Sequence, residues 1–184
     1  MKEILPWKIL DSRYLFRRKW MDVREDRVEL PTGVIIDEFH VIEYPDWVCV
    51  LPITDDGSVV LVEQYRHGIG RLSTEFPAGV IDEGESILEA ARRELLEETG
   101  YAARRWSELG SCTPEPSRHS NMAHFVLAGG AYRAARPAPD ESENVRVRIE
   151  TAGAIPGIIE RREMIHGVHL AAVMTAVLKG ELSF

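Results

Sequence analysis

The sequence predicts an α/β fold of the α+β type: a mixed β-sheet sandwiched between α-helices, with an N-terminal antiparallel strand extension. Three observations carry this prediction. Short β-type runs separated by turn residues fill residues 11–65, a capped amphipathic helix occupies residues 86–100, and the tail from 153 to 180 has a helical pattern. With 184 residues, 45% hydrophobic and 28% charged, the chain is expected to form one domain, residues 1–184.

The N-terminal part, residues 1–45, is expected to form the strand extension, and residues 46–184 the core. In the extension, Pro31-Thr32-Gly33 is a turn between two β-type runs. In the core, Thr54-Asp55-Asp56-Gly57 joins two apolar runs and indicates a hairpin. The strands expected in chain order are residues 14–16, 22–30, 34–42, 47–53, 58–65, 102–111, 123–128 and 145–149. The tail reads as two helices broken near residues 163–167.

The helix before residue 100 carries clear start and stop signals. Ser86 is a good N-cap, Glu89 three residues later completes a capping box, and Gly100 suits a left-handed C-cap. An apolar stripe at helical spacing predicts the buried face; it consists of Leu88, Ala91 and Leu95.

Three carboxylates crowd another face of this helix. Glu94, Glu97 and Glu98 fall at i, i+3 and i+4, where like charges repel and destabilise a helix unless something neutralises them. A hard divalent cation with oxygen ligands would do so, and Mg²⁺ is the usual choice beside a phosphate. The alternative interpretation is a solvated acidic face.

The spacing to neighbouring residues favours the metal interpretation. Gly79 and Gly84 bracket a tight loop, and the segment follows the pattern Gly79, five residues, Glu85, seven residues, Arg93-Glu94-Leu95-x-Glu97-Glu98-x-Gly100. This pattern resembles the box of the Nudix hydrolases, with Tyr101 where an aliphatic residue is usual. The resemblance implies the Nudix fold and cleavage of a diphosphate bond.

By position in that motif, the resemblance implies metal ligation by Glu94, Glu98 and the backbone carbonyl of Ala78. Glu97 and Arg93 are the candidate catalytic residues inside the box. Arg93 is also expected to pair with Glu85 and hold the glutamates in place. The implied cofactor is Mg²⁺, with Mn²⁺ as a substitute.

The flanking segments are similar to the ADP-ribose pyrophosphatase branch of the family. The carrying features are Glu63-Gln64-Tyr65-Arg66-His67-Gly68, then Glu75-Phe76-Pro77-Ala78-Gly79, and Pro116 fifteen residues after the box. The candidate substrate-binding residues are Arg66, Glu75, Gly79, Pro116 and Phe39. Arg66 could bind phosphate in a bidentate manner or be a surface charge at a strand end. Pro114-Glu115-Pro116 departs from the Pro-Gly of many members, which leaves the specificity loop open.

A second acidic segment, Asp140-Glu141-Ser142-Glu143, precedes a Val-rich strand. In the resembled enzymes, a loop of this form supplies the carboxylate that acts on the attacking water. The resemblance therefore implies Glu141 as the catalytic base and Glu143 as a residue near the metal, with Glu143 as the competing base and a solvated loop as the other alternative.

Charge and composition exclude several classes of protein. A net charge of −8 argues against binding of nucleic acid through its phosphates. The N-terminus has no signal-peptide stretch, and the longest apolar segment, near residues 168–178, is too short to span a bilayer. We expect a cytoplasmic protein without a membrane partner, with Cys49 and Cys112 as reduced thiols. His166 and His169 are expected to serve packing.

The extension holds more apolar side chains than a minimal Nudix domain needs, which predicts a homodimer interface. These residues are Phe16, Trp20, Val34, Ile35, Ile36 and Phe39. Core packing is expected for Phe16, Trp20 and Phe39, and the family resemblance adds stacking on adenine as an alternative.

The sequence thus predicts an Mg²⁺-dependent hydrolase of a nucleoside diphosphate sugar, with ADP-ribose as the first substrate and AMP and ribose 5-phosphate as products. Another nucleotide sugar, such as GDP-mannose, is the alternative substrate. A nucleotide-sensing module with a Nudix fold and no turnover is the alternative from a different class, and the intact glutamate set argues against it.

Overall fold

The protein is described by a computed structural model over residues 3–138 and 144–184. The chain divides into two compact units, one made of residues 1–45 and 113–122, the other of residues 46–112 and 123–184. We call them the N-terminal unit and the sheet unit. The single-domain interpretation of the sequence stays a prediction.

The N-terminal unit is a three-stranded antiparallel sheet in the order β1-β2-β3. Its strands are β1 (Lys8–Arg18), β2 (Met21–Glu29) and β3 (Ile35–Glu43), which confirms the predicted strands and lengthens the first. Gly33, with φ of 82°, closes the predicted turn before β3. The loop 113–122 joins this unit through Ile42, which forms a parallel bridge with His119 and donates its N–H to the Arg118 carbonyl at 2.8 Å.

Two aromatic side chains of this unit are not in a core. Phe16 is 38% exposed and Trp20 63% exposed, so the prediction that they pack in the core is wrong. The reason is architectural: over its described residues the unit has no helix to cover either face of its sheet. The other large apolar residues exposed in residues 3–45 are Ile4, Leu5, Trp7, Ile9, Tyr14, Leu15, Val34, Ile35 and Tyr44.

The sheet unit contains a seven-stranded mixed sheet whose main path is β10-β5-β4-β9-β8, with β6 paired to β5 and β7 paired to β4. β4 and β9 run parallel, whereas the other pairs are antiparallel, which confirms the mixed sheet. The strands are β4 (Trp47–Thr54), β5 (Ser58–Arg66), β6 (Arg71–Glu75), β7 (Ala78–Val80), β8 (Tyr101–Cys112), β9 (Ala123–Arg133) and β10 (Val145–Thr151).

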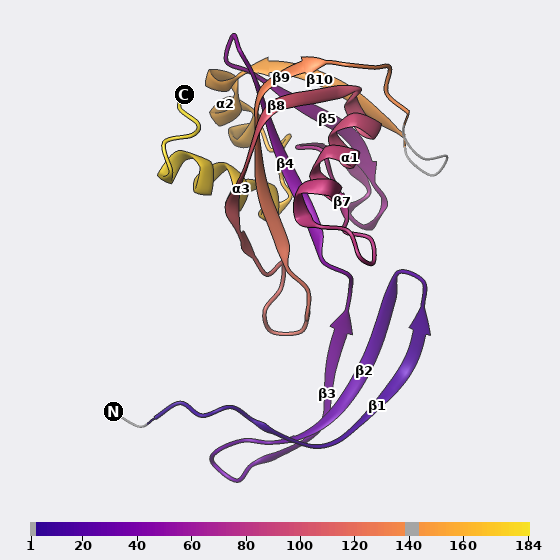
Figure 1. The fold of residues 1–184 in the computed structure, drawn as a ribbon. Coiled ribbons are helices and arrows are strands. Elements are labelled where there is room, and N and C mark those ends of the chain that lie inside the picture. The colour runs from indigo at the N-terminus through magenta and orange to yellow at the C-terminus, as the bar shows by residue number, and fades with distance from the viewer. Residues whose placement is uncertain (1–2, 139–143) are drawn as a thin grey trace. The chain divides into compact units, whose positions relative to one another are not determined.

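Helices cover both faces of this sheet, as predicted (Figure 1). Alternation along β4 shows how one strand serves two layers: Cys49 and Leu51 pack in the cluster with the C-terminal helices, and Val48 and Val50 in the cluster with α1. The helices are α1 (Ile87–Thr99), α2 (Ile155–Glu160) and α3 (Gly167–Leu178), with 3-10 turns η1 (His67–Ile69) and η2 (Ala152–Ala154).

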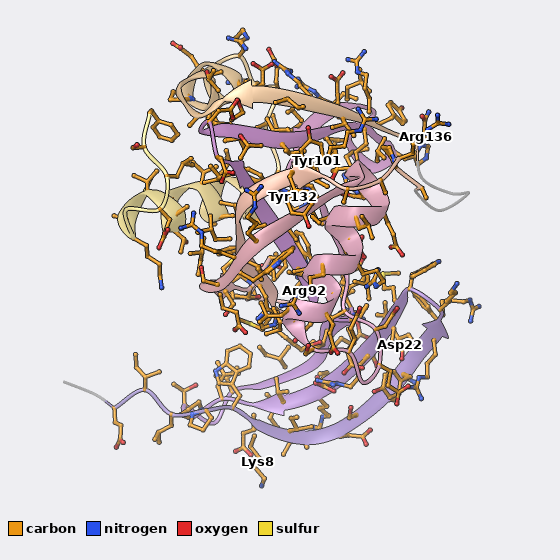
Figure 2. The ribbon with its side chains drawn as sticks, turned by 45° about the horizontal axis from the view of Figure 1, so that its top comes forward. Lys8, Asp22, Arg92, Tyr101, Tyr132 and Arg136 are labelled. Carbon is orange, nitrogen blue, oxygen red and sulfur yellow. The ribbon has the colours of Figure 1, made fainter. Side chains whose placement is uncertain are left out.

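Both predicted ends of α1 are confirmed. The Ser86 hydroxyl accepts from the Glu89 N–H, the Glu89 side chain accepts from the Ser86 N–H, and Gly100 is left-handed with φ of 72°. Arg92 extends from the helix (Figure 2), and its guanidinium carbon lies 5.4 Å from the Trp106 ring centroid on β8. The helix is thereby fixed at its ends and along its side.

Within residues 3–138 and 144–184, we find no helix that combines the length and the apolar character needed to cross a membrane. The cytoplasmic location expected from the sequence stays a prediction.

Candidate active site

Two carboxylates of α1 are buried on one face of the helix. Glu94 and Glu98 stand four residues apart, so their side chains leave the helix in similar directions. Their residual exposures are 6% and 2%. Glu98 Oε2 accepts a hydrogen bond from the Ala78 N–H at 3.1 Å, which ties this carboxylate to the start of β7. The three residues predicted as metal ligands therefore lie in one place.

Gly79 makes room for one of these carboxylates. A Cβ placed on Gly79 would lie 1.9 Å from Glu94 Oε1, a separation that atoms do not reach. Position 79 must therefore lack a side chain as long as Glu94 keeps its place. This packing explains the first glycine of the motif without a ligand, and the predicted contact of Gly79 with substrate stays a prediction.

Arg93 connects the helix to the loop before it. Its Nε and Nη2 donate to the two carboxylate oxygens of Glu85 at 3.0 and 2.8 Å, and Nη2 also donates to the Val80 carbonyl at 2.8 Å. Its Nη1 donates to Glu94 Oε1 at 2.7 Å. The bidentate pair with Glu85 fixes the guanidinium plane, which then orients the Glu94 carboxylate.

The charges of this pair stabilise each other. The hydrogen bond to Glu85, followed by the hydrogen bond to Glu94, raises the pKa of Arg93 despite partial burial. The Arg93 hydrogen bonds in turn hold the pKa of Glu85 below its ordinary value. Arg93 thus stays charged, and its contacts fit the expected pairing with Glu85 better than a contact with reacting atoms.

Glu97 differs from its two neighbours. Its side chain is 45% exposed, and its Oε2 lies 3.4 Å from Arg93 Nη1. In the part of the chain that the structure describes, no three Asp, Glu, His or Cys side chains converge as a metal-binding group. The three glutamates share a side of the helix as predicted, but only Glu94 and Glu98 are buried there.

The buried pair fits a magnesium ion. Mg²⁺ is usually held by one or two carboxylates, with waters and substrate phosphates completing its octahedron. Glu94 and Glu98 supply two hard oxygen donors beside the backbone of Ala78, and a third acidic ligand is not required. Two buried carboxylates one helical turn apart also repel each other, and a cation bound by both would relieve that repulsion.

Arg66 ends β5 in a bidentate ion pair. Its Nε donates to Glu75 Oε1 at 3.0 Å and its Nη2 to Glu75 Oε2 at 2.5 Å. The Arg66 side chain is 39% exposed, whereas that of Glu75 is fully buried. Burial alone would raise the pKa of Glu75, but the Arg66 hydrogen bonds and the His169 ring outweigh it and hold this pKa below its ordinary value.

Glu75 is therefore closed off from a ligand in this conformation, because its carboxylate is buried and paired with Arg66. Arg66 was interpreted either as a phosphate-binding residue or as a surface charge at a strand end. It does lie half-exposed at the end of a strand, and a buried carboxylate fixes its guanidinium plane. Such a fixed plane is suited to bidentate binding of phosphate.

A buried histidine, His169, completes this group, although the sequence predicted only a packing role for it. His169 Nδ1 accepts the Phe76 N–H at 3.1 Å and lies 3.5 Å from Cys49 Sγ, while Nε2 lies 3.3 Å from Glu75 Oε2. Burial lowers the pKa of His169 to about 3. The one available signal was a polar ring inside a run of α3 that is apolar apart from Thr175. His166 caps that helix by accepting the Val168 N–H at 3.3 Å.

Of the remaining predicted residues, two belong to the N-terminal unit and two are not described by the structure. Phe39 belongs to the N-terminal unit, where its ring packs edge-on against Trp7 with centroids 5.6 Å apart. Pro116 is exposed in the loop 113–122 of the same unit. Glu141 and Glu143 lie outside the described residues.

Family models match most of the chain. The NUDIX domain model matches residues 43–167, and the model of the nucleoside diphosphate sugar hydrolase N-terminal domain matches residues 7–42. The second match coincides with the three-stranded sheet of the N-terminal unit.

Two relatives and one solved structure extend the comparison. The chain is 30% identical over 179 residues to the ADP-ribose pyrophosphatase of Bacillus subtilis (strain 168), covering 97% of this chain and 96% of the relative. It is 32% identical over 146 residues to the methanol dehydrogenase activator of Bacillus methanolicus, covering 79% and 78%. The fold is similar to the crystal structure of an ADP compounds hydrolase, with a TM-score of 0.86, 24% identity and coverage of 99% and 100%.

Proposed function

Because this chain belongs to the Nudix family of hydrolases, we propose that it cleaves the diphosphate bond of a nucleoside diphosphate sugar in a reaction that depends on a divalent metal ion. We propose ADP-ribose as the substrate, with AMP and ribose 5-phosphate as products. The length of the match to an ADP-ribose pyrophosphatase supports this substrate, because it includes the strands before the Nudix motif.

One observation carries the proposal. Glu94 and Glu98 are two buried carboxylates on one face of α1, set against the backbone at Ala78 and the bare Cα of Gly79. A buried like-charged pair is costly, and the fold maintains it with a capped helix and an arginine dedicated to the motif. A buried carboxylate pair supported in this way is expected of a metal site and not of a solvated acidic face.

The residues would divide the work as follows. Glu94, Glu98 and the Ala78 carbonyl would hold Mg²⁺, or Mn²⁺ in its place, which supplies phosphate charge neutralisation and a more acidic bound water. Arg66 would bind phosphate oxygens with the guanidinium plane that Glu75 fixes. Arg93 keeps Glu94 oriented. We assign the general base to Glu141 in the acidic loop, with Glu143 as the competing residue.

A substrate panel tests this function. The purified protein is incubated with ADP-ribose, GDP-mannose and other nucleotide sugars, with Mg²⁺ or Mn²⁺ and with excess EDTA, and release of nucleoside monophosphate is measured. We expect turnover of ADP-ribose with metal and loss of turnover with EDTA.

Glu98→Gln tests the metal ligand, because it keeps the size of the side chain and an acceptor for the Ala78 N–H while removing the ligand charge. It should remain folded and lose most of its activity. Preference for GDP-mannose would change the substrate assignment alone. Undiminished turnover in EDTA would overturn the metal site, and absence of turnover on the whole panel would favour a sensing module.

We also propose that the protein is a homodimer that associates through its N-terminal unit. The support is the number of large apolar side chains exposed on that unit, since the surface of a soluble monomer rarely gathers so many of them. Association would provide the cover that the three-stranded sheet lacks within its own unit.

A further inference from the structure

His169 carries contacts that core packing does not require. It lies in α3, its ring is fully buried, and its neighbours along the helix are apolar apart from Thr175. Burying a polar ring costs free energy unless its nitrogens are used. Leucine or methionine would fill the same space without that cost, so the contacts of the two nitrogens are the feature to explain.

We propose that His169 is a positioning residue for substrate binding: it holds the carboxylate of Glu75, and Glu75 holds the guanidinium of Arg66. The inference rests on the proposed function in one respect, namely that Arg66 is the group that meets the substrate's phosphate. The three side chains are connected by contacts at Glu75 Oε2, and they run from the fully buried His169 and Glu75 to the partly exposed Arg66.

The contacts of the two ring nitrogens of His169 decide which of them carries the proton. Two donors point at Nδ1: the Phe76 N–H at 3.1 Å, and the Cys49 thiol at 3.5 Å, whose pKa burial raises so that it keeps its proton. Nδ1 is therefore an acceptor, and the single proton of the neutral ring lies on Nε2. Nε2 has no hydrogen-bond partner among the described residues that meets strict geometry, and Glu75 Oε2, 3.3 Å away, is the acceptor it faces.

The Glu75 carboxylate needs a hydrogen-bond donor on its buried side. Arg66 approaches this carboxylate from the exposed end with two parallel hydrogen bonds. A buried carboxylate is stable only when its oxygens are satisfied, and an inner donor prevents the group from turning away from Arg66. The Nε2–H of His169 is placed to be that donor.

The residues packed around His169 fix the orientation of its ring. Phe76 stacks on it with planes 11° apart and centroids separated by 6.2 Å, and His166 packs edge-on at 4.7 Å. The backbone bond to Phe76 fixes the remaining rotation. The imidazole is thus held in one orientation, which a donor that positions a carboxylate requires.

Two substitutions separate positioning from packing. In His169→Asn the amide reaches only the place of Nδ1, so it can keep the Phe76 bond but not the approach to Glu75. In His169→Gln the amide reaches the place of Nε2 and can keep the approach to Glu75. His124→Asn on β9 is the same exchange outside this group, since His124 faces Asp46 at 3.4 Å.

The first measurement needs no activity. The Arg66 Nε–H signal in ¹H–¹⁵N spectra, assigned by its loss in Arg66→Lys, reports the bond to Glu75 through its rate of exchange with solvent. We expect exchange about tenfold faster in His169→Asn, which corresponds to about 1.4 kcal/mol of lost protection. His169→Gln should recover most of the protection, and His124→Asn should leave it unchanged. Equal exchange rates in wild type and His169→Asn would overturn the proposal.

A further spectrum uses the unaltered protein, so it decides the proposal even if the variants fail to fold. Long-range ¹H–¹⁵N correlations of His169 should show the proton on Nε2. A proton on Nδ1 would overturn the proposal, because Nε2 could then not donate to Glu75.

Kinetics then connect the group to the substrate. His169→Asn should raise KM for ADP-ribose about three- to tenfold with a smaller change in kcat, and His169→Gln should restore most of the affinity. In the Arg66→Ala background, His169→Asn should add nothing to KM, since Arg66 is the route of its effect. An additive effect on KM in that background would overturn the proposal. If the protein turns over no nucleotide sugar, the proposed function fails, while the Arg66 signal still decides the role of His169.

Discussion

At the scale of single residues, the site depends on where a side chain is missing as much as on where one is present. The Glu94 carboxylate occupies the space that a side chain at position 79 would fill. Glycine is often explained by a positive φ, but Gly79 is not among the glycines with that conformation. Its requirement is steric, and it belongs to a partner fifteen residues away in the sequence.

Gly79→Ala should therefore displace Glu94. We expect a loss of about 1–3 kcal/mol in the free energy of unfolding, as for other insertions into packed sites, together with a large loss of activity. Urea unfolding and the nucleotide-sugar assay measure the two effects. Gly153→Ala is the control, because a Cβ there meets nothing within 4 Å. In a Glu94→Ala background the stability cost should largely disappear; if it persists, the clash with Glu94 is not its cause.

Glu141→Gln and Glu143→Gln address the base. If Glu141 accepts the proton of the attacking water, Glu141→Gln should lower kcat by about 10²–10⁴-fold with little change in KM, because the interaction is made in the transition state. Single-turnover kinetics of the two variants, measured in parallel, decide the assignment. Loss of rate only in Glu143→Gln would move the base to that residue, and full rates in both would reduce the loop to a linker.

At the scale of elements, the loop before α1 and the helix itself are joined through one side chain. Arg93 binds Glu85 in the loop, the Val80 carbonyl at the end of β7, and Glu94 on the helix. The loop therefore cannot move away from the helix without breaking charge-assisted hydrogen bonds. This connection makes the stability of the motif depend on pH.

The direction of that dependence follows from Glu85. Its pKa is lowered in the folded protein by Arg93, so its contribution to stability is present above the ordinary pKa of about 4.3 and is lost as the pH falls through the lowered value. Glu85→Gln should have a lower urea midpoint than wild type at pH 6 to 7. The difference should shrink as the pH approaches 3. A difference that stays constant from pH 7 to pH 3 would show that the charge of Glu85 does not contribute.

Elements were predictable from sequence wherever a local signal sets them. The caps of α1, the turn at Gly57 and the strand β4 are set by neighbours in the chain, and all three were predicted. The short strands β6 and β7 were not predicted. In β6, the polar run Ser73-Thr74-Glu75 gives no strand signal, because tertiary contacts bury it here.

The same limit applies to the site. The sequence motif predicted that Glu94 and Glu98 share a face of α1, since spacing within one helix determines a face. The contacts of Glu75 with His169 join residues 94 positions apart, and no periodicity reports such a contact. The exposure of Phe16 and Trp20 was mispredicted for a related reason: a side chain's apolar character does not reveal whether a second layer exists to cover it.

At the scale of the whole molecule, the exposed apolar surface of the N-terminal unit predicts association. Light scattering at micromolar concentration should give twice the mass of one chain. Trp20→Lys should shift the population toward monomer. Trp20 is 63% exposed in the single chain, and the substitution places a charge in the proposed interface. Leu178→Lys, at an equally apolar exposed position on α3, is the control and should stay dimeric. A monomeric wild type with full activity would contradict the proposal.

The N-terminal unit also has a consequence for the order of folding. It is built from two stretches of chain, 1–45 and 113–122, and Ile42 at the end of β3 bonds to Arg118 and Ser120 in the second stretch. During synthesis on a ribosome, β3 must wait until β4 to β8 have emerged before these partners exist. A chain cut before residue 46 would keep the loop 113–122 but lose the strand to which its backbone is bonded. The unit is therefore not a detachable module, and a single gene truncation could not remove it cleanly.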